Sequence, residues 1–378
     1  MRALVARVLS RKTTLLSLLL VILVVGATTL AVSRKQENLL TIGQASAARP
    51  QTLLPPTRLL ALPASRIANG TEPLTVTLSA PVAGNSPAPT LRPAVAGTWT
   101  AAGDSEVFTA ASTLEPCSTY MLTVWADTLA VGHSRLGRRR TIALSVACPP
   151  TAGLQQALAR LGYLGARFHP LYDVNLRSGR ETRREAAVWA FHPPRGRLAP
   201  DPSDAPPVDM GQLDETTRGA LMVYQSDRGL EATGEPDSAT WASLLSAETS
   251  YRRDPRSYTW VTVSEGSPET LEVHQGDRVA LSSPANTGVA GAETPQGVFP
   301  VFARFTSTTM TGTDVDGTHY VVPDVPWVNY FNGGDAVHGY PRASYGSPQS
   351  NGCVELPIET AQAVFGMLAI GDIVEVTS

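Results

Sequence analysis

The feature that most constrains this chain is an uncharged apolar run near its start. Thr13 to Val32 holds no charged residue and consists mostly of Leu, Val, Ala and Ile. As a helix with a rise of about 1.5 Å per residue, the run spans roughly 30 Å, the thickness of a bilayer's hydrocarbon core. Basic residues flank it, with more in front: Arg2, Arg7, Arg11 and Lys12 against Arg34 and Lys35. This charge bias predicts that residues 1–12 stay in the cytoplasm and that the chain after the run is exported.

A cleaved signal peptide is the alternative interpretation of residues 13–32, because its flanks look alike although its apolar stretch is usually shorter. Either interpretation exports the rest of the chain, held at the cell membrane or secreted. Residues 33–58 mix small, polar and proline residues without periodicity, and we expect them to form a linker.

Charge and cysteine content exclude several classes of protein. The 378 residues include 30 Lys+Arg and 33 Asp+Glu, a formal net charge of −3, so the chain lacks the basic surplus that nucleic-acid binders use. With 17% charged and 43% hydrophobic residues, it is not a disordered polyelectrolyte. Three cysteines are too few for a disulfide scaffold, and the odd number leaves one without an internal partner.

Residues 59–149 predict a small β-sandwich. Short runs of β-branched and apolar residues alternate with turn residues, as in Leu74–Leu78, Glu106–Thr109, Tyr120–Trp125 and Thr141–Val146. The segments TVTLSAPVAG, LRPAVAGTW and TLEPCSTYMLTV resemble bacterial Ig-like domains, which implies a spacer arm. Cys117 and Cys148 both lie here. Because disulfides persist in exported segments, we expect these two to pair, the alternative being two free buried thiols.

Around residue 150 the apolar period becomes helical. Leucines recur at helical spacing over Leu154–Leu161, and further helices are expected to begin near Asp214 and Asp237. The segments LQQALARLGYL, LDETTRGALMVYQ and RGLEATGEPDSATWASLL closely resemble the three-helix peptidoglycan-binding module. That resemblance implies a helical domain over residues 150–249 that binds peptidoglycan. Residues 165–212 depart from it, because they intervene between the first and second helices.

Residues 255–378 predict a mostly-β domain with one packed helix. Strand-like runs are Thr259–Val263, Thr270–Val273, Val298–Phe305, Thr318–Val322 and Ile373–Val376. A single helical pattern covers roughly Ile358 to Met367.

Cys353 is the odd thiol of the chain, and His338 lies a short distance upstream. An imidazole can take the proton of a neighbouring thiol or hold it as a thiolate–imidazolium pair, and either makes cysteine a nucleophile at neutral pH. Gly352 permits a tight turn whose backbone N–H groups can point at the oxygen of a tetrahedral intermediate. The alternative from these residues alone is a small buried cysteine and an unrelated surface histidine.

Four segments surround these residues: TPQGVF at 294–299, VPWVNYF at 325–331, AVHG at 336–339 and SNGCV at 350–354. In this order and spacing they closely resemble the L,D-transpeptidase catalytic domain of the YkuD type. The resemblance implies that Cys353 is the nucleophile, His338 the general base and Gly339 the residue whose carbonyl orients the imidazole. It also implies an oxyanion hole formed by the backbone N–H groups of Gly352 and Cys353, with that of Asn351.

Two positions depart from the family pattern. Asn351 stands where a second histidine is usual, and Glu355 stands where asparagine or arginine is common. A backbone N–H contribution at Asn351 survives the change, whereas any task of the imidazole does not. If an arginine of the family binds a substrate carboxylate, Arg342 is a candidate to replace it, or else a solvated loop residue. Further candidates for substrate binding are Tyr320, Trp327, Tyr340 and Ser350, although aromatic residues in β-rich domains are more often part of the core.

The resemblance implies a cysteine acyltransferase of the cell wall, an L,D-transpeptidase that forms 3→3 cross-links between peptidoglycan stem peptides. One alternative is an L,D-carboxypeptidase, in which water resolves the acyl-enzyme. Another is a non-catalytic peptidoglycan-binding protein with a decayed catalytic domain. No HExxH or CxxC pattern accompanies the histidines, so we expect no metal site, and the chemistry needs no cofactor.

Overall fold

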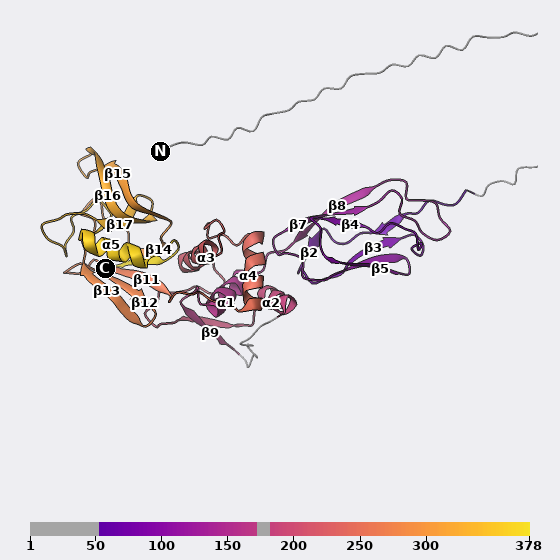
Figure 1. Cartoon of the computed structure of the whole chain (residues 1–378), viewed down its shortest axis with the longest axis horizontal. Coiled ribbons are helices and arrows are strands. Elements are labelled where there is room, and N and C mark those ends of the chain that lie inside the picture. Colours follow the sequence, from indigo (N-terminus) through magenta and orange to yellow (C-terminus); the bar gives the residue numbers. More distant parts are fainter. Residues whose placement is uncertain (1–52, 172–181) are drawn as a thin grey trace, which may run out of the picture. The chain divides into compact units, whose positions relative to one another are not determined.

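The computed structural model describes residues 53–171 and 182–378 (Figure 1). The membrane or signal segment expected at residues 13–32 lies outside this part of the chain. Within the described residues, no helix combines the length and the apolar character that crossing a membrane requires. The described elements fall into three groups that follow one another along the sequence.

The first group is a β-sandwich. Its strands are β1 (Leu59–Ala61), β2 (Arg66–Ile67), β3 (Leu74–Leu78), β4 (Thr90–Arg92), β5 (Gly97–Ala102), β6 (Ser105–Ala110), β7 (Thr119–Val124) and β8 (Arg140–Val146). They form two four-stranded sheets, in the orders β1-β3-β6-β5 and β2-β8-β7-β4. Because side chains alternate along a strand, β3 buries Leu74, Val76 and Leu78. These pack in one core with residues such as Leu122 and Leu144 of the other sheet.

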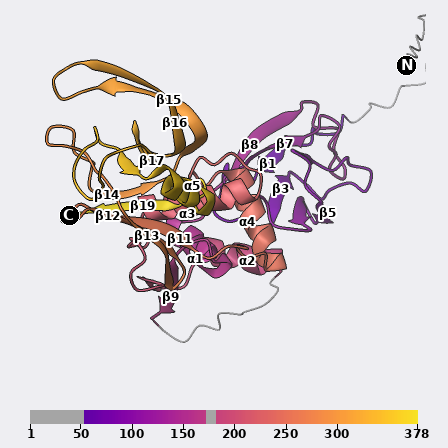
Figure 2. The ribbon, with the colours of Figure 1, turned by 60° about the vertical axis from the view of Figure 1, so that its left-hand side comes forward.

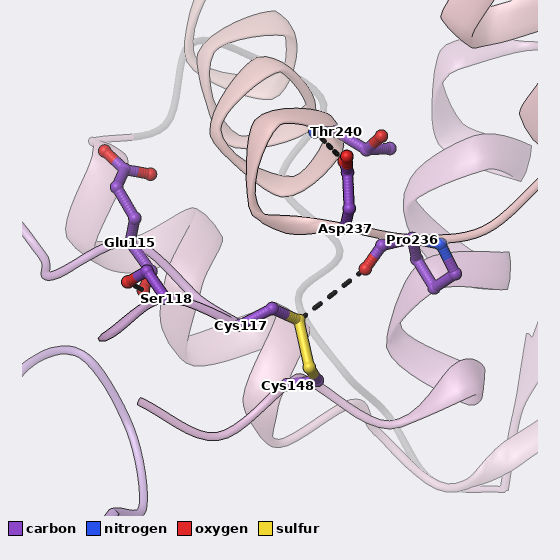
Figure 3. The surroundings of a disulfide bond; sticks show 7 residues. All are labelled: Glu115, Cys117, Ser118, Cys148, Pro236, Asp237 and Thr240. Carbon is purple, nitrogen blue, oxygen red and sulfur yellow. Dashed lines mark hydrogen bonds between the residues drawn. A yellow bond between two sulfur atoms is a disulfide. The ribbon is translucent and has the colours of Figure 1, made fainter. Parts of the chain in front are cut away.

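A disulfide joins Cys117 and Cys148, the pair expected from the sequence (Figure 3). Cys117 precedes β7 and Cys148 follows β8, so the bond lies where the sandwich ends and the next group begins. The sulfur of Cys117 lies 3.6 Å from the carbonyl oxygen of Pro236, next to the N-cap residue Asp237. The disulfide is therefore also a contact between the sandwich and the helical group.

The helical group contains four helices where the sequence predicted three. They are α1 (Thr151–Leu161), α2 (Arg183–Phe191), α3 (Glu215–Asp227) and α4 (Ser238–Ser250), accompanied by an antiparallel pair, β9 (Ala166–Pro170) and β10 (Gly196–Pro200). The prediction of three helices was wrong because α2 lies within the expected insertion. A capping box between Thr182 and Glu185 begins α2, and its alanines are buried against the core formed by the other helices.

The last group agrees with the expected mostly-β domain with one helix. Its elements are β11 (Thr259–Ser264), β12 (Thr270–Gln275), β13 (Arg278–Pro284), β14 (Gly297–Pro300), β15 (Ala303–Thr313), β16 (His319–Asn332), β17 (Asp335–Gly339), β18 (Val354–Leu356), α5 (Ile358–Met367) and β19 (Ile373–Thr377). One sheet has the order β13-β12-β11-β19-β14 and the other β15-β16-β17-β18. Val261 of β11, Val337 of β17 and Val364 of α5 are fully buried in one cluster, so both sheets and the helix share a core.

Strands β15 and β16 form a long hairpin that extends beyond the neighbouring strands (Figure 2). Its turn is closed by backbone hydrogen bonds, from the Asp314 N–H to the Thr318 carbonyl at 2.8 Å and from the Gly317 N–H to the Asp314 carbonyl at 2.9 Å. Because β16 also pairs with β17, the hairpin is tied to the strand on which His338 lies.

Candidate active site

Two adjacent parallel strands carry the thiol and the imidazole expected from the sequence. His338 lies on β17 and pairs with Glu355 on β18, while Cys353 directly precedes β18. Residues two positions apart on a strand share a face, so the side chains of Cys353 and His338 emerge on the same side of the sheet. Both line one cavity of about 340 Å³.

His338 is buried, with 3% of its surface exposed, and its Nδ1 lies 3.0 Å from the carbonyl oxygen of Gly339. A carbonyl oxygen can only accept a hydrogen bond, so Nδ1 carries the proton and Nε2 keeps a free lone pair. Burial lowers the pKa of His338 below its ordinary value, an effect that the Gly339 hydrogen bond and the charge of Glu355 oppose. The imidazole is therefore neutral near pH 7 and able to accept a proton.

The thiol of Cys353 is protonated in the resting site. Burial raises the pKa of Cys353 to about 12, the Ala336 backbone N–H lowers it, and the negative charges of Asp335 and Glu355 raise it further. Of the two arrangements that the sequence left open, these pKa shifts favour a neutral thiol and a neutral imidazole in one cavity over a preformed ion pair. The thiol lies 3.8 Å from the carbonyl oxygen of Gly334, to which it can donate.

Gly352 shapes the loop before Cys353. Its φ of +106° lies in the left-handed region, and a Cβ at this position would lie 2.4 Å from Oδ1 of Asp335. The carbonyl of Gly352 accepts a hydrogen bond from Oγ1 of Thr294 at 2.9 Å, and the carbonyl of Cys353 accepts one from Oγ of Ser350 at 2.5 Å. Among the hydrogen bonds of the described residues, none uses the backbone N–H groups of Gly352 or Cys353. These two donors are available to a developing oxyanion.

Two buried polar side chains that the sequence analysis missed hold the surrounding loops. The carboxylate of Glu269 accepts hydrogen bonds from the N–H and the hydroxyl of Thr287, at 2.7 and 2.8 Å, and the Thr287 carbonyl accepts one from the Ser350 N–H. Asn286 accepts a hydrogen bond from the Gly346 N–H at 3.0 Å. Both Glu269 and Asn286 lie in loops or at strand ends, where a single sequence does not separate buried polar residues from solvated ones.

Arg342 is already paired. Its Nε and Nη2 donate to the two carboxylate oxygens of Glu355, at 2.7 and 2.8 Å, and Nη2 also donates to the carbonyl of Gln349. Its guanidinium lies 4.8 Å from the ring centroid of Tyr340. The suggestion that Arg342 stands ready for a substrate carboxylate is therefore corrected. Glu355, the residue that departs from the family pattern, occupies it.

Three of the four residues expected to bind substrate line the cavity, namely Tyr320, Tyr340 and Ser350. Trp327 does not line it. Its ring lies 5.6 Å from that of Phe365 on α5, and it packs against the shared core. The φ of +59° at Trp327 breaks the regular alternation of β16, which lets this large apolar side chain turn under the helix.

Asn351 connects the nucleophile loop to the hairpin. Its Nδ2 donates to Oδ1 of Asp314, at the turn between β15 and β16, and both residues line the cavity. The side chain that replaces the usual histidine therefore has a definite structural partner, which sequence reasoning did not reveal.

Two family models match the chain. Residues 258–376 match the L,D-transpeptidase catalytic domain, and residues 198–244 match a putative peptidoglycan binding domain. Among solved structures, the catalytic domain of an E. faecium L,D-transpeptidase is 27% identical over 33% of this chain and 100% of its own, with a TM-score of 0.30. An L,D-transpeptidase from Mycobacterium smegmatis is 13% identical over 85% of this chain and 100% of its own, with a TM-score of 0.29. L,D-transpeptidase 3 from Mycobacterium tuberculosis is 14% identical over 85% and 98%, with a TM-score of 0.29. A search of curated proteins gave no match.

Replacing Gly352 by alanine should disable the loop. A residue with a Cβ is strained at a φ of +106°, and relief of this strain moves the N–H groups of Gly352 and Cys353, while the carboxylate of Asp335 must also shift. We expect acylation of Cys353 by a β-lactam to slow by at least about 100-fold, measured by mass spectrometry over time. Gly366→Ala on α5, where a Cβ meets nothing within 4 Å, is the control. Near-normal acylation of the Gly352 variant would contradict the role given to this loop.

The protonation states predict a characteristic pH dependence of alkylation. Because the pKa of Cys353 is raised to about 12, its thiolate fraction at neutral pH is small. The rate constant for alkylation by iodoacetamide should therefore rise about tenfold per pH unit between about pH 7 and 10. A preformed thiolate–imidazolium pair would instead give a plateau over this range, and observing that plateau would overturn the assignment.

Proposed function

Because residues 258–376 form an L,D-transpeptidase catalytic domain and residues 198–244 a peptidoglycan-binding domain, we propose that this chain forms 3→3 cross-links in peptidoglycan by a cysteine acyl-enzyme mechanism. One observation carries the proposal. The Cys353 thiol and the His338 imidazole line the same cavity, beside a loop whose two backbone N–H groups have no acceptor among the described residues.

In the first half of the proposed reaction, Cys353 attacks the carbonyl of the diamino acid at the third position of a donor stem. Nε2 of His338 takes the thiol proton as the C–S bond forms, and the backbone N–H groups of Gly352 and Cys353 stabilise the oxyanion. When the intermediate collapses, the C–N bond to the terminal D-Ala breaks. The proton on His338 passes to the leaving amine, which departs as D-Ala.

In the second half, the side-chain amine of a neighbouring stem attacks the thioester. His338 takes a proton from this amine, a new amide bond forms and the C–S bond breaks. The imidazolium then returns the proton to the sulfur, a transfer favoured by the high pKa of Cys353 and the low pKa of His338. The enzyme ends in the neutral state in which it began, without a cofactor.

We also propose that the chain acts outside the cytoplasm, held at the membrane by residues 13–32 or released after their cleavage. The apolar run and the positive charges in front of it support this proposal. Immunoblots of membrane and medium fractions test it. A catalytic domain recovered from neither fraction, but from the cytoplasm, would contradict export.

Acylation by a carbapenem tests the nucleophile. The E. faecium catalytic domain has been solved acylated by ertapenem, so we expect ertapenem to form a covalent adduct on Cys353 of the purified protein. Cys353→Ala should abolish the adduct, and His338→Ala should slow its formation by at least about 100-fold. His133→Ala, in the β-sandwich, is the matched control. Intact peptidoglycan binding without any adduct would support a decayed domain.

The resolving nucleophile is tested in the same experiment with natural substrate. Muropeptide analysis after incubation with peptidoglycan separates 3→3 dimers, formed when an amine resolves the acyl-enzyme, from trimmed stems, formed when water does. Trimmed stems alone would replace the transpeptidase by an L,D-carboxypeptidase and leave the acyl-enzyme mechanism intact.

A further inference from the structure

Of the carboxylates that line the cavity, one is paired with a cation and the other is not. Two of its lining residues in the described part of the chain carry carboxylates, Glu355 and Asp314. Glu355 is neutralised by its two hydrogen bonds to Arg342, the cation of this cavity wall. Asp314 is half-buried at the hairpin turn, and its side-chain partner is the neutral amide of Asn351, while no ion pair of the described residues includes it.

Building on the proposed function, we propose that Asp314 is a specificity-determining residue whose carboxylate binds a primary ammonium group of a stem-peptide diamino acid. Two sources can supply this group, the side chain of the donor stem or the amine of the acceptor stem. Both present the same chemistry to the carboxylate, and kinetics separates them.

The orientation of Asp314 suits this role. Its backbone is fixed by the two hydrogen bonds that close the turn, to Thr318 and from Gly317. Its side chain is fixed by Asn351, which donates to Oδ1. No hydrogen bond of the described residues uses Oδ2, so one oxygen of an oriented carboxylate remains for a ligand. A charged group held this way loses little conformational entropy when it binds.

Asp314 also lies near the reacting sulfur. Its partner Asn351 is two residues before Cys353 in the nucleophile loop. Tyr320 lines the same cavity as Asp314 and Cys353. A stem bonded to the sulfur therefore occupies the cavity that the carboxylate of Asp314 also lines.

The charge of the cavity favours a cation over an anion at this place. A substrate carboxylate would find Arg342 occupied and would be repelled by Asp314. An ammonium group would pair with Asp314, and its positive charge would offset the negative charges that raise the pKa of Cys353. Substrate binding would then make the thiol easier to deprotonate at the moment when His338 must take its proton.

Two aspartates in one turn provide a matched pair of variants. Asp314→Asn removes the charge and keeps an oxygen that Asn351 can bond. Asp316→Asn removes the same charge from the same turn. Asp316 is exposed and does not line the cavity, and its Oδ1 accepts a hydrogen bond from the Thr318 N–H. Asp314→Glu keeps the charge and tests whether charge, rather than packing, is responsible.

The experiment measures the two half-reactions separately with the purified protein. Release of D-Ala from a synthetic tetrapeptide donor without acceptor reports acylation, and the donor is used with its side-chain amine free or acetylated. Product formation at varied concentrations of an amine acceptor reports the second half. Acylation by a β-lactam that carries no amine reports the proposed function independently of any ammonium group.

We expect Asp314→Asn to raise KM for the ammonium-bearing substrate by about tenfold, with Asp316→Asn at the wild-type value and Asp314→Glu between them. A rise for the free-amine donor that disappears with the acetylated donor assigns the contact to the donor. A rise in KM for the acceptor with unchanged donor acylation assigns it to the acceptor. Equal behaviour of the Asp314→Asn and Asp316→Asn variants in both half-reactions overturns the inference. Failure of the wild-type protein to react with the β-lactam overturns the proposed function instead.

Discussion

Parallel pairing between β17 and β18 places the thiol and the imidazole on one face of one sheet. The pairing aligns His338 with Glu355 and leaves Cys353 at the point where the chain enters β18. Val337 and Val354, between these polar positions, are fully buried in the core shared with α5. Moving either strand by one residue would turn its polar side chains into this core and its valines toward the cavity. The geometry of the site therefore depends on hydrophobic burial on the opposite face of the same two strands.

Burial also determines the chemistry of the two groups. Desolvation disfavours the charged form of each, so it raises the pKa of Cys353 and lowers that of His338. A neutral thiol is a poor target for oxidants, which protects Cys353, the free cysteine of the described residues. In the proposed mechanism the nucleophile is generated during the attack itself, which requires an imidazole whose free nitrogen is already oriented. The hydrogen bond from Nδ1 of His338 to Gly339 provides that orientation.

The spacing of apolar residues along the sequence predicted many of the strands and helices, because an element with one buried face carries apolar residues at its own structural period. Strands such as β3, β6, β7, β8, β11, β12 and β19, and the helix from Ile358, follow from this pattern. The expected strand Val298–Phe305 is divided in the structure between β14 and β15, and the short strands β17 and β18 were not predicted. Helix α2 was missed because its buried face consists of small alanines, which give a weak periodic signal. Trp327 was placed in the cavity because a sequence does not show the positive φ that turns it under α5.

Some residues of the candidate site could also be found from the sequence, whereas others became visible only in the structure. Cys353 and His338 were singled out by their residue types and by a family resemblance, and their roles stay proposals. Glu269 and Asn286 escaped notice because burial of a polar loop residue is decided by tertiary contacts that no local pattern records. The role of Asp314 depends on a hairpin turn meeting a loop from a distant part of the sequence.

The two departures from the family pattern act on the cavity in the same direction. Glu355 occupies the guanidinium of Arg342 and so removes a free positive charge. Asn351 donates to Asp314 without neutralising it, whereas a protonated histidine at that position would pair with the carboxylate. With only one of these two changes, the cavity would still hold either a free arginine or a neutralised Asp314, and it would not clearly prefer a cationic ligand over an anionic one. Together they leave Asp314 as the carboxylate without a paired cation among the residues that line the cavity, which supports the proposed recognition of an amine.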